Sequence, residues 1–223
     1  MENLQQTEAE LSTENKDGDE WQIDNVPNRL TILRVLLIPV LIICLGSGLF
    51  ENIANDPWRR PLEWISAIIF ILASITDFFD GHIARKRKIV TVFGSFLDPI
   101  ADKFLVVSSL ILLLGLGRIN TVIVIILILR EMYMTSLRLL AIERGIKVPV
   151  NNLGKWKTTF QMIAIPMLMI NADFYGIPLD TTGALFIYLA AFLSLYSAVI
   201  YSMGLVVKIK ELRAMKKMAG KKA

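Results

Sequence analysis

The sequence predicts an all-α integral membrane protein with six transmembrane helices. Of its 223 residues, 54% are hydrophobic, and the mean hydropathy of the chain is +0.55. These values are typical of a protein embedded in lipid and exclude an ordinary soluble enzyme. The apolar residues also gather into six stretches of about 20 residues, which is the length that crosses a bilayer as a helix.

Turn residues and charged loops separate the six apolar stretches. Pro57 and Pro61 mark the loop after the first stretch, and Gly176 marks the loop before the last. Gly115 and Gly117 predict a tight turn between the third and the fourth. The predicted membrane segments are residues 29–49, 62–82, 95–116, 119–142, 154–173 and 182–207.

The charges predict how the chain is oriented and divided. Lys and Arg are concentrated in the loops 83–94 and 143–157 and in the C-terminal segment, which places these regions and both termini on the cytoplasmic side of the membrane. Residues 1–26 carry eight acidic residues and one Lys, so we expect a disordered acidic extension. Residues 27–210 would form the membrane domain, and residues 211–223 a basic, helical cytoplasmic tail.

Four carboxylates lie where the second apolar stretch ends and the third begins. Asp77 and Asp80 share one helix face by their spacing, as do Asp98 and Asp102. Two helices joined by a short loop can bring these faces together into a cage of oxygen ligands, which suits Mg²⁺ or Mn²⁺. Four carboxylates are enough for two ions about 3.5–4 Å apart, as used in phosphoryl displacement.

Other residues of the same region suit a diphosphate ligand. Arg85 offers a planar pair of donors, and Thr91 offers a hydroxyl. Gly81 and Gly94 permit close approach of the backbone. The alternative is a buried ion-pair network, in which Arg85 and Lys103 would neutralise the aspartates, but two cations are too few for four acids.

Seven of these residues, together with Ala84, form one spaced motif, D-x2-D-G-x2-A-R-x8-G-x3-D-x3-D, which runs from Asp77 to Asp102. The motif resembles the signature of the CDP-alcohol phosphotransferases, membrane enzymes in which an alcohol attacks a CDP-linked phosphorus and expels CMP. The resemblance implies the fold of that family, a homodimer, and Asp77, Asp80, Asp98 and Asp102 as metal ligands. Asp102 would also be the catalytic base that accepts the hydroxyl proton.

The first apolar stretch adds a polar stripe. Asn28, Thr31 and Arg34 recur every three residues and resemble the N-x2-T-x2-R pattern of bacterial phosphatidylglycerophosphate synthases. Helix capping by Asn28 and an interfacial Arg34 are the alternative. By this resemblance the residues that bind CDP-diacylglycerol are Asn28, Thr31, Gly81, Arg85, Thr91 and Gly94.

Basic residues in the second half of the chain indicate an anionic acceptor. Arg130 interrupts the fourth apolar stretch at a depth where it should face a watered pocket or pair with Glu131. Convergent Arg and Lys suit a phosphorylated acceptor, whereas a neutral alcohol does not need them. Signalling of topology is the alternative for Lys155, Lys157 and Arg144, but it does not explain Arg130.

Segments from Arg130 to Met162 also resemble the bacterial phosphatidylglycerophosphate synthases, whose acceptor is sn-glycerol 3-phosphate. This resemblance implies that the acceptor phosphate is bound by Arg34, Arg130, Arg138 and Lys155. The expected reaction gives phosphatidylglycerophosphate and CMP by direct in-line attack, although a two-step route through an aspartyl intermediate would use the same residues.

Two alternatives remain for the function. The same chemistry could use another acceptor, such as inositol phosphate, serine or phosphatidylglycerol. A divalent-cation transporter would also need intramembrane carboxylates, but here they lie near one membrane face, and Arg85 would oppose cation passage. Membrane lipid is the expected surrounding partner, and no nucleic acid is expected.

Overall fold

The computed structural model describes residues 26–49, 57–87, 92–146 and 152–219. The predicted acidic extension lies outside these residues except for Val26. The side chains of residues 26–30, 48, 77–87, 92–99, 102, 152–153, 212–213 and 215–219 also lie outside the description.

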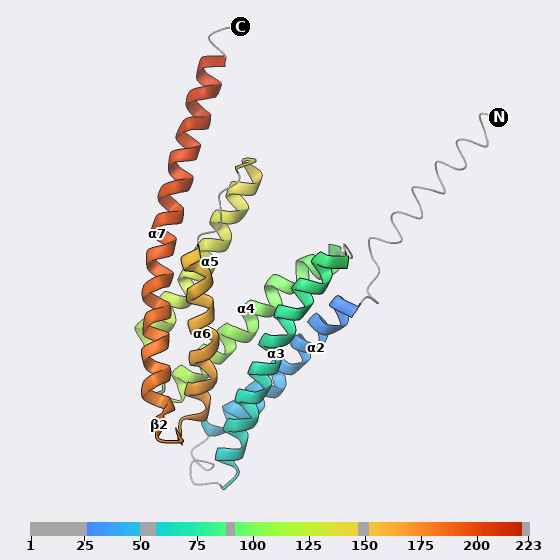
Figure 1. Cartoon of the computed structure of the whole chain (residues 1–223), viewed down its shortest axis with the longest axis vertical. Coiled ribbons are helices and arrows are strands. Elements are labelled where there is room, and N and C mark those ends of the chain that lie inside the picture. Colours follow the sequence, from blue (N-terminus) through green and yellow to red (C-terminus); the bar gives the residue numbers. More distant parts are fainter. Residues whose placement is uncertain (1–25, 50–56, 88–91, 147–151, 220–223) are drawn as a thin grey trace, which may run out of the picture. The chain divides into compact units, whose positions relative to one another are not determined.

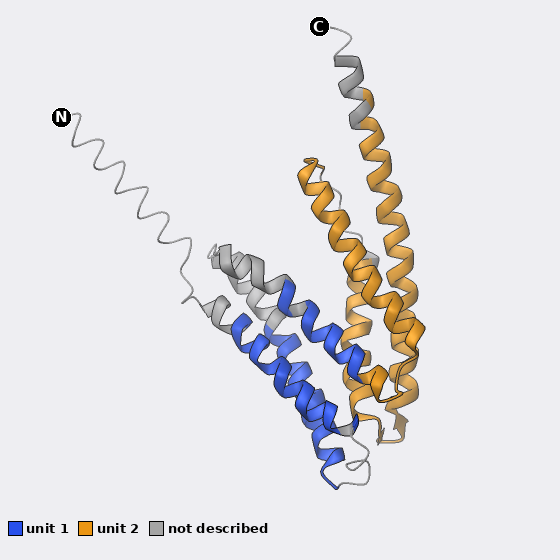
Figure 2. Cartoon of the chain, turned by 180° about the vertical axis from the view of Figure 1, so that it is seen from behind, with its two compact units in different colours: residues 1–112 blue, residues 113–223 orange. Residues whose placement is uncertain are grey.

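Helices account for nearly all of the described chain (Figure 1). They fall into two compact units, residues 1–112 and residues 113–223 (Figure 2). In chain order the elements are α2 (Val26–Gly46), the 3₁₀ turn η1 (Ser47–Leu49), α3 (Arg59–Arg87), α4 (Val92–Gly115), α5 (Thr121–Glu143), α6 (Asn152–Ile170), β1 (Asp173–Phe174), β2 (Ile177–Pro178) and α7 (Leu179–Ala219).

Each predicted apolar stretch falls mainly within one of these helices. The prediction of a loop over residues 83–94 is wrong, because most of these residues are helical. Helix α3 continues to Arg87, and α4 begins at Val92. Ala, Arg and Lys are good helix formers, so the chain stays helical past the point where its apolar residues end. The predicted turn at Gly117 is confirmed, because this residue has φ 70° and Arg118 N donates to Leu113 O at 2.9 Å.

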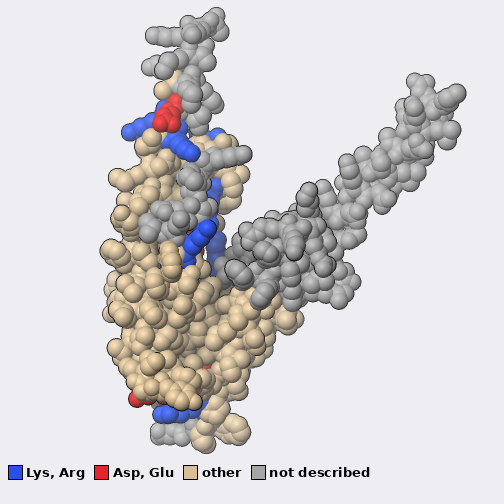
Figure 3. Space-filling view, viewed as in Figure 1, with Lys and Arg blue, Asp and Glu red and all other residues tan. Residues whose placement is uncertain are grey.

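Within the described residues, one helix is long and apolar enough to cross a bilayer by itself. This segment, Leu179–Glu211 of α7, has 33 residues and contains an 18-residue window with a mean hydropathy of 2.0. In Figure 3 the surface over α7 shows almost no charged side chain between its two ends. The apolar helical segments Thr31–Gly46 and Lys103–Gly115 are shorter. Helix α7 continues to Ala219, which confirms that the basic tail is helical up to that residue.

In the first unit, α2 and α3 pack against each other through apolar side chains. Leu41 and Leu45 of α2 are buried, and Phe70 and Ala73 of α3 are fully buried. The buried positions of α2 recur every three or four residues, as expected for one face of a helix. The same buried face continues toward the N-terminus of α2, where it includes Arg34.

In the second unit, α6 and α7 are joined by a two-residue hairpin between β1 and β2. Tyr175 and Gly176 both have positive φ, 50° and 81°, as a tight hairpin turn requires. The two helices approach closely at Gly183, where an added Cβ would lie 2.9 Å from Leu168 Cγ. Nearby, the Arg118 guanidinium donates to Leu168 O at 3.0 Å, which satisfies a carbonyl in the last turn of α6.

The contact at Gly183 predicts a clear difference between two glycines of α7. Gly183→Ala should lower the free energy of unfolding by about 1–3 kcal/mol, because the new methyl group overpacks the α6 interface. Gly204→Ala is the matched control, since nothing lies within 4 Å of its added Cβ, and it should be neutral or stabilising by up to about 1 kcal/mol. Equal unfolding midpoints for the two variants would contradict this packing.

Candidate active site

The motif aspartates lie on two consecutive helices of the first unit. Asp77 and Asp80 are three residues apart in α3, and Asp98 and Asp102 are four apart in α4. The side chains of these residues, and those of Asn28, Arg85 and Thr91, lie outside the described part of the chain. Within that described part, no three His, Cys, Asp or Glu side chains form a group that could hold a metal ion. The four aspartates supply only hard oxygen donors, which fit Mg²⁺ or Mn²⁺ by their chemistry.

The predicted polar stripe of α2 faces inward. Thr31 and Arg34 are each only 1% exposed. They stand in register with Ile38 and Leu41, which are buried further along the same helix. These two residues therefore bring a hydroxyl and a positive charge into the interior of the first unit.

Arg130 ties α5 to α7 inside the second unit. The residue is 8% exposed, and all three of its guanidinium nitrogens make hydrogen bonds. Nε donates to the Ser194 carbonyl at 3.2 Å, and Nη2 donates to Ser197 Oγ at 2.8 Å. Nη1 donates to Glu131 Oε1 at 3.0 Å, which confirms the predicted pairing of these neighbours. The burial of this charge is therefore compensated by partners from two helices.

Glu131 also connects α5 to α6. The Lys157 ammonium forms an ion pair with Glu131 Oε1, the same oxygen that accepts from Arg130. Lys157 is 3% exposed, whereas the Glu131 side chain is 25% exposed. One carboxylate oxygen therefore joins two buried cations from different helices. Such a charge-assisted arrangement is stronger and more specific in geometry than a surface ion pair.

Arg138 and Lys155, the other predicted acceptor ligands of this unit, are exposed. Neither side chain forms a hydrogen bond or an ion pair with a residue that the structure describes. The structure therefore does not bring them into the Arg130 cluster. Lys157, which was not among the predicted acceptor ligands, takes that position instead.

Helical periodicity contains the signal for Lys157. Gln161, Ala164 and Leu168 are buried along α6, at spacings of three and four residues after Lys157. This register places Lys157 on the inward face of the helix and Lys155 on the outward face. The residues that sequence reasoning missed in the cluster are Lys157, Ser194 and Ser197.

Two polar atoms near this cluster are buried without a hydrogen bond to any described residue. They are Gln161 Nε2, on a residue 2% exposed, and Ser194 Oγ, on a residue with no exposure. An unsatisfied buried polar group costs about 1–3 kcal/mol. The second unit therefore keeps polar atoms in its interior that do not stabilise its fold.

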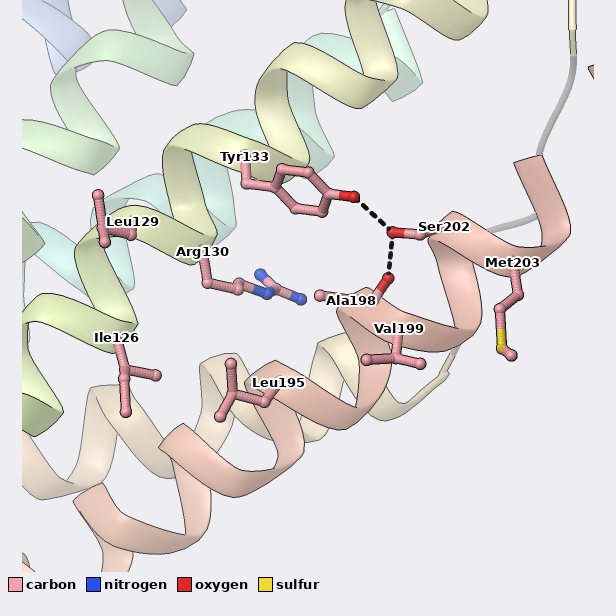
Figure 4. A pocket seen from close by; sticks show the side chains of 9 residues that line it. All are labelled: Ile126, Leu129, Arg130, Tyr133, Leu195, Ala198, Val199, Ser202 and Met203. Carbon is pink, nitrogen blue, oxygen red and sulfur yellow. Dashed lines mark hydrogen bonds between the residues drawn. The ribbon is translucent and has the colours of Figure 1, made fainter. Parts of the chain in front are cut away.

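A pocket of about 580 Å³ lies beside Arg130, between α5 and α7 (Figure 4). Figure 4 shows the Arg130 side chain reaching across toward α7, while Tyr133 and Ser202 lie side by side and share a hydrogen bond of 2.9 Å. The wall is otherwise apolar. Its lining residues are Ile126, Leu129, Arg130, Tyr133, Leu195, Ala198, Val199, Ser202 and Met203.

The contacts of Arg130 predict different consequences for two serines of α7. Ser197→Ala should lower the free energy of unfolding by about 1–3 kcal/mol, because it removes a partner of a buried cation. Ser194→Ala should leave it unchanged or raise it by up to about 1–3 kcal/mol, because Arg130 uses only the carbonyl of that residue and the hydroxyl is buried without a hydrogen bond to a described residue. Chemical or thermal unfolding of the two variants measures the difference. A larger loss for Ser194→Ala would contradict the arrangement.

Comparison with known proteins agrees with this architecture. The pattern that defines the CDP-alcohol phosphatidyltransferase family matches residues 24–207. A CDP-diacylglycerol--glycerol-3-phosphate 3-phosphatidyltransferase of Rickettsia bellii (strain RML369-C) is 40% identical over 179 residues, covering 80% of this chain and 93% of that protein. The enzyme of the same name from Bacillus subtilis (strain 168) is 38% identical over 178 residues, covering 79% and 90%.

A plant relative carries a different name. A cardiolipin synthase (CMP-forming) of Oryza sativa subsp. japonica is 38% identical over 194 residues, covering 79% of this chain and 56% of that protein. The family pattern spans both units of the structure, from two residues before α2 to residue 207 of α7. The chain therefore belongs to the CDP-alcohol phosphatidyltransferase family.

Proposed function

We propose that this protein transfers the phosphatidyl group of CDP-diacylglycerol to sn-glycerol 3-phosphate, giving phosphatidylglycerophosphate and CMP. One observation carries the proposal. The relatives named for this reaction match four fifths of the chain at about 40% identity, and the chain holds all eight positions of the aspartate motif between Asp77 and Asp102. The chain thus contains the complete aspartate motif and also matches these relatives downstream of it.

The reaction assigns roles to the chain's own residues. The acceptor hydroxyl attacks the phosphatidyl phosphorus, the bond from this phosphorus to the CMP oxygen breaks, and Asp102 accepts the hydroxyl proton. Asn28, Thr31, Gly81, Arg85, Thr91 and Gly94 would hold CDP-diacylglycerol. Two Mg²⁺ or Mn²⁺ ions, held by the four motif aspartates, would neutralise charge on the diphosphate and on the departing CMP.

Arg130 suits the binding of a phosphorylated acceptor. A guanidinium has five N–H donors, and the described contacts of Arg130 use one N–H on each of its three nitrogens. Each terminal nitrogen therefore keeps a second N–H, which can donate to a phosphate oxygen. We propose that Arg34, Arg138 and Lys155 also bind the acceptor phosphate, with Arg138 and Lys155 acting from exposed positions outside the Arg130 cluster.

The proposal includes a location. Six membrane-spanning helices would place the aspartates at the cytoplasmic face of a bacterial inner membrane, with both termini in the cytoplasm. This topology is supported by the apolar α7 segment and by the basic residues of the loops. The acyl chains of the substrate would remain in surrounding lipid, and we expect the protein to form a homodimer.

A lipid-product assay on the purified full-length protein in detergent tests the function. With CDP-diacylglycerol, Mg²⁺ and labelled glycerol 3-phosphate, we expect label in the lipid fraction and one CMP released per labelled lipid. Asp98→Asn should lower kcat at least about a hundredfold, because it removes a charged oxygen from the cation site. Asp173→Asn is the matched control, since Asp173 is exposed in the hairpin, and its rate should be unchanged.

Two further arms complete this experiment. A chelator should abolish the activity and excess Mg²⁺ or Mn²⁺ should restore it, whereas activity that persists in chelator would contradict the metal site. The rice relative supports phosphatidylglycerol as a second candidate acceptor. CMP release with phosphatidylglycerol, and none with glycerol 3-phosphate, would favour that reaction over the one proposed.

A further inference from the structure

Lys157 is a buried cation that the proposed chemistry does not use. It lies on α6, 3% exposed, with its ammonium paired to Glu131 Oε1. Burying a lysine costs several kcal/mol unless its charge is compensated. A basic residue that only signalled topology would be exposed to solvent rather than buried. Its burial therefore indicates a role inside the unit.

The carboxylate that pairs with Lys157 also pairs with Arg130. Glu131 Oε1 accepts from both cations, at 3.0 Å from Arg130 Nη1. The Nε and Nη2 nitrogens of Arg130 are fixed on α7 by the Ser194 carbonyl and the Ser197 hydroxyl. The orientation of the Arg130 guanidinium is thus determined by α7 on one side and by Glu131 on the other.

Glu131 is also a competitor for Arg130. A carboxylate opposite a guanidinium prefers a bidentate pair, in which two oxygens accept from two nitrogens. Such a pair would consume the second N–H groups that the terminal nitrogens of Arg130 retain. In the structure, Arg130 donates to a single oxygen of the Glu131 carboxylate, and Lys157 shares that oxygen.

We propose that Lys157 is a positioning residue for acceptor binding. By holding the Glu131 carboxylate, it keeps Arg130 from forming a bidentate pair and leaves the outer N–H groups of Arg130 to the acceptor's phosphate. The inference rests on the proposed function, because it assigns Lys157 to the acceptor half of that reaction. Lys157 acts through Glu131 and need not touch the acceptor.

Steady-state kinetics of the full-length protein test this role. Lys157→Met keeps the length of the side chain and removes its charge, so we expect the KM for glycerol 3-phosphate to rise about tenfold, the effect of one charge-assisted hydrogen bond. The kcat and the KM for CDP-diacylglycerol should stay within about twofold. Lys157→Arg should restore most of the acceptor affinity. Lys210→Met, at an exposed position of α7, is the matched control and should leave all three constants unchanged.

A double-mutant cycle with Glu131→Gln separates positioning from packing. If Lys157 acts through Glu131, the double variant should have the same acceptor KM as Glu131→Gln alone. Multiplied effects of the two substitutions would overturn the inference. So would an unchanged acceptor KM in Lys157→Met, or a fall in kcat that only follows the fraction of folded protein.

The wild-type protein distinguishes this inference from the proposed function. Wild-type activity with glycerol 3-phosphate, together with a normal acceptor KM in Lys157→Met, would overturn the role of Lys157 alone. A wild-type protein that does not use glycerol 3-phosphate would overturn the proposed function and the inference with it.

Discussion

The guanidinium of Arg130 is the constraint on which the second unit depends. A charge inside an apolar helical unit must be met by partners, since an uncompensated buried ion costs several kcal/mol. Helix α7 supplies a carbonyl and a hydroxyl, α5 supplies Glu131, and α6 supplies Lys157 through that carboxylate. The contacts that compensate the charge of Arg130 are therefore the same contacts that hold α5, α6 and α7 together.

Small residues on α7 allow the helices to approach closely enough for these contacts to Arg130. Ala190, Ala191, Ser194 and Ala198 are buried along one face of the helix, and small side chains of this kind let helix backbones approach closely in membrane proteins. Close approach brings the Ser194 carbonyl within reach of Arg130. The interior of the unit therefore contains polar groups that lower the stability of the fold. Such groups are expected where a sequence is adapted to binding rather than to packing alone.

The sequence predicted the helices well and their ends poorly. Hydropathy shows where apolar residues stop, but α3 and α7 continue into basic segments, because Lys and Arg are also good helix formers. The pairing of Arg130 with Glu131 was predictable from a cation at membrane depth beside a carboxylate. The inward position of Lys157 could have been found from its register with Gln161. The role of Ser197 could not, because serines in helices commonly bond to their own backbone, as Ser66 and Ser109 do here.

The most direct test of this account is an experimental structure of the full-length protein in lipid with glycerol 3-phosphate and Mn²⁺. The account predicts a phosphate oxygen within hydrogen-bond distance of a terminal nitrogen of Arg130. It also predicts that Nε still donates to the Ser194 carbonyl and that Lys157 remains on Glu131. A phosphate bound away from Arg130, or an Arg130 held by both oxygens of Glu131, would contradict it.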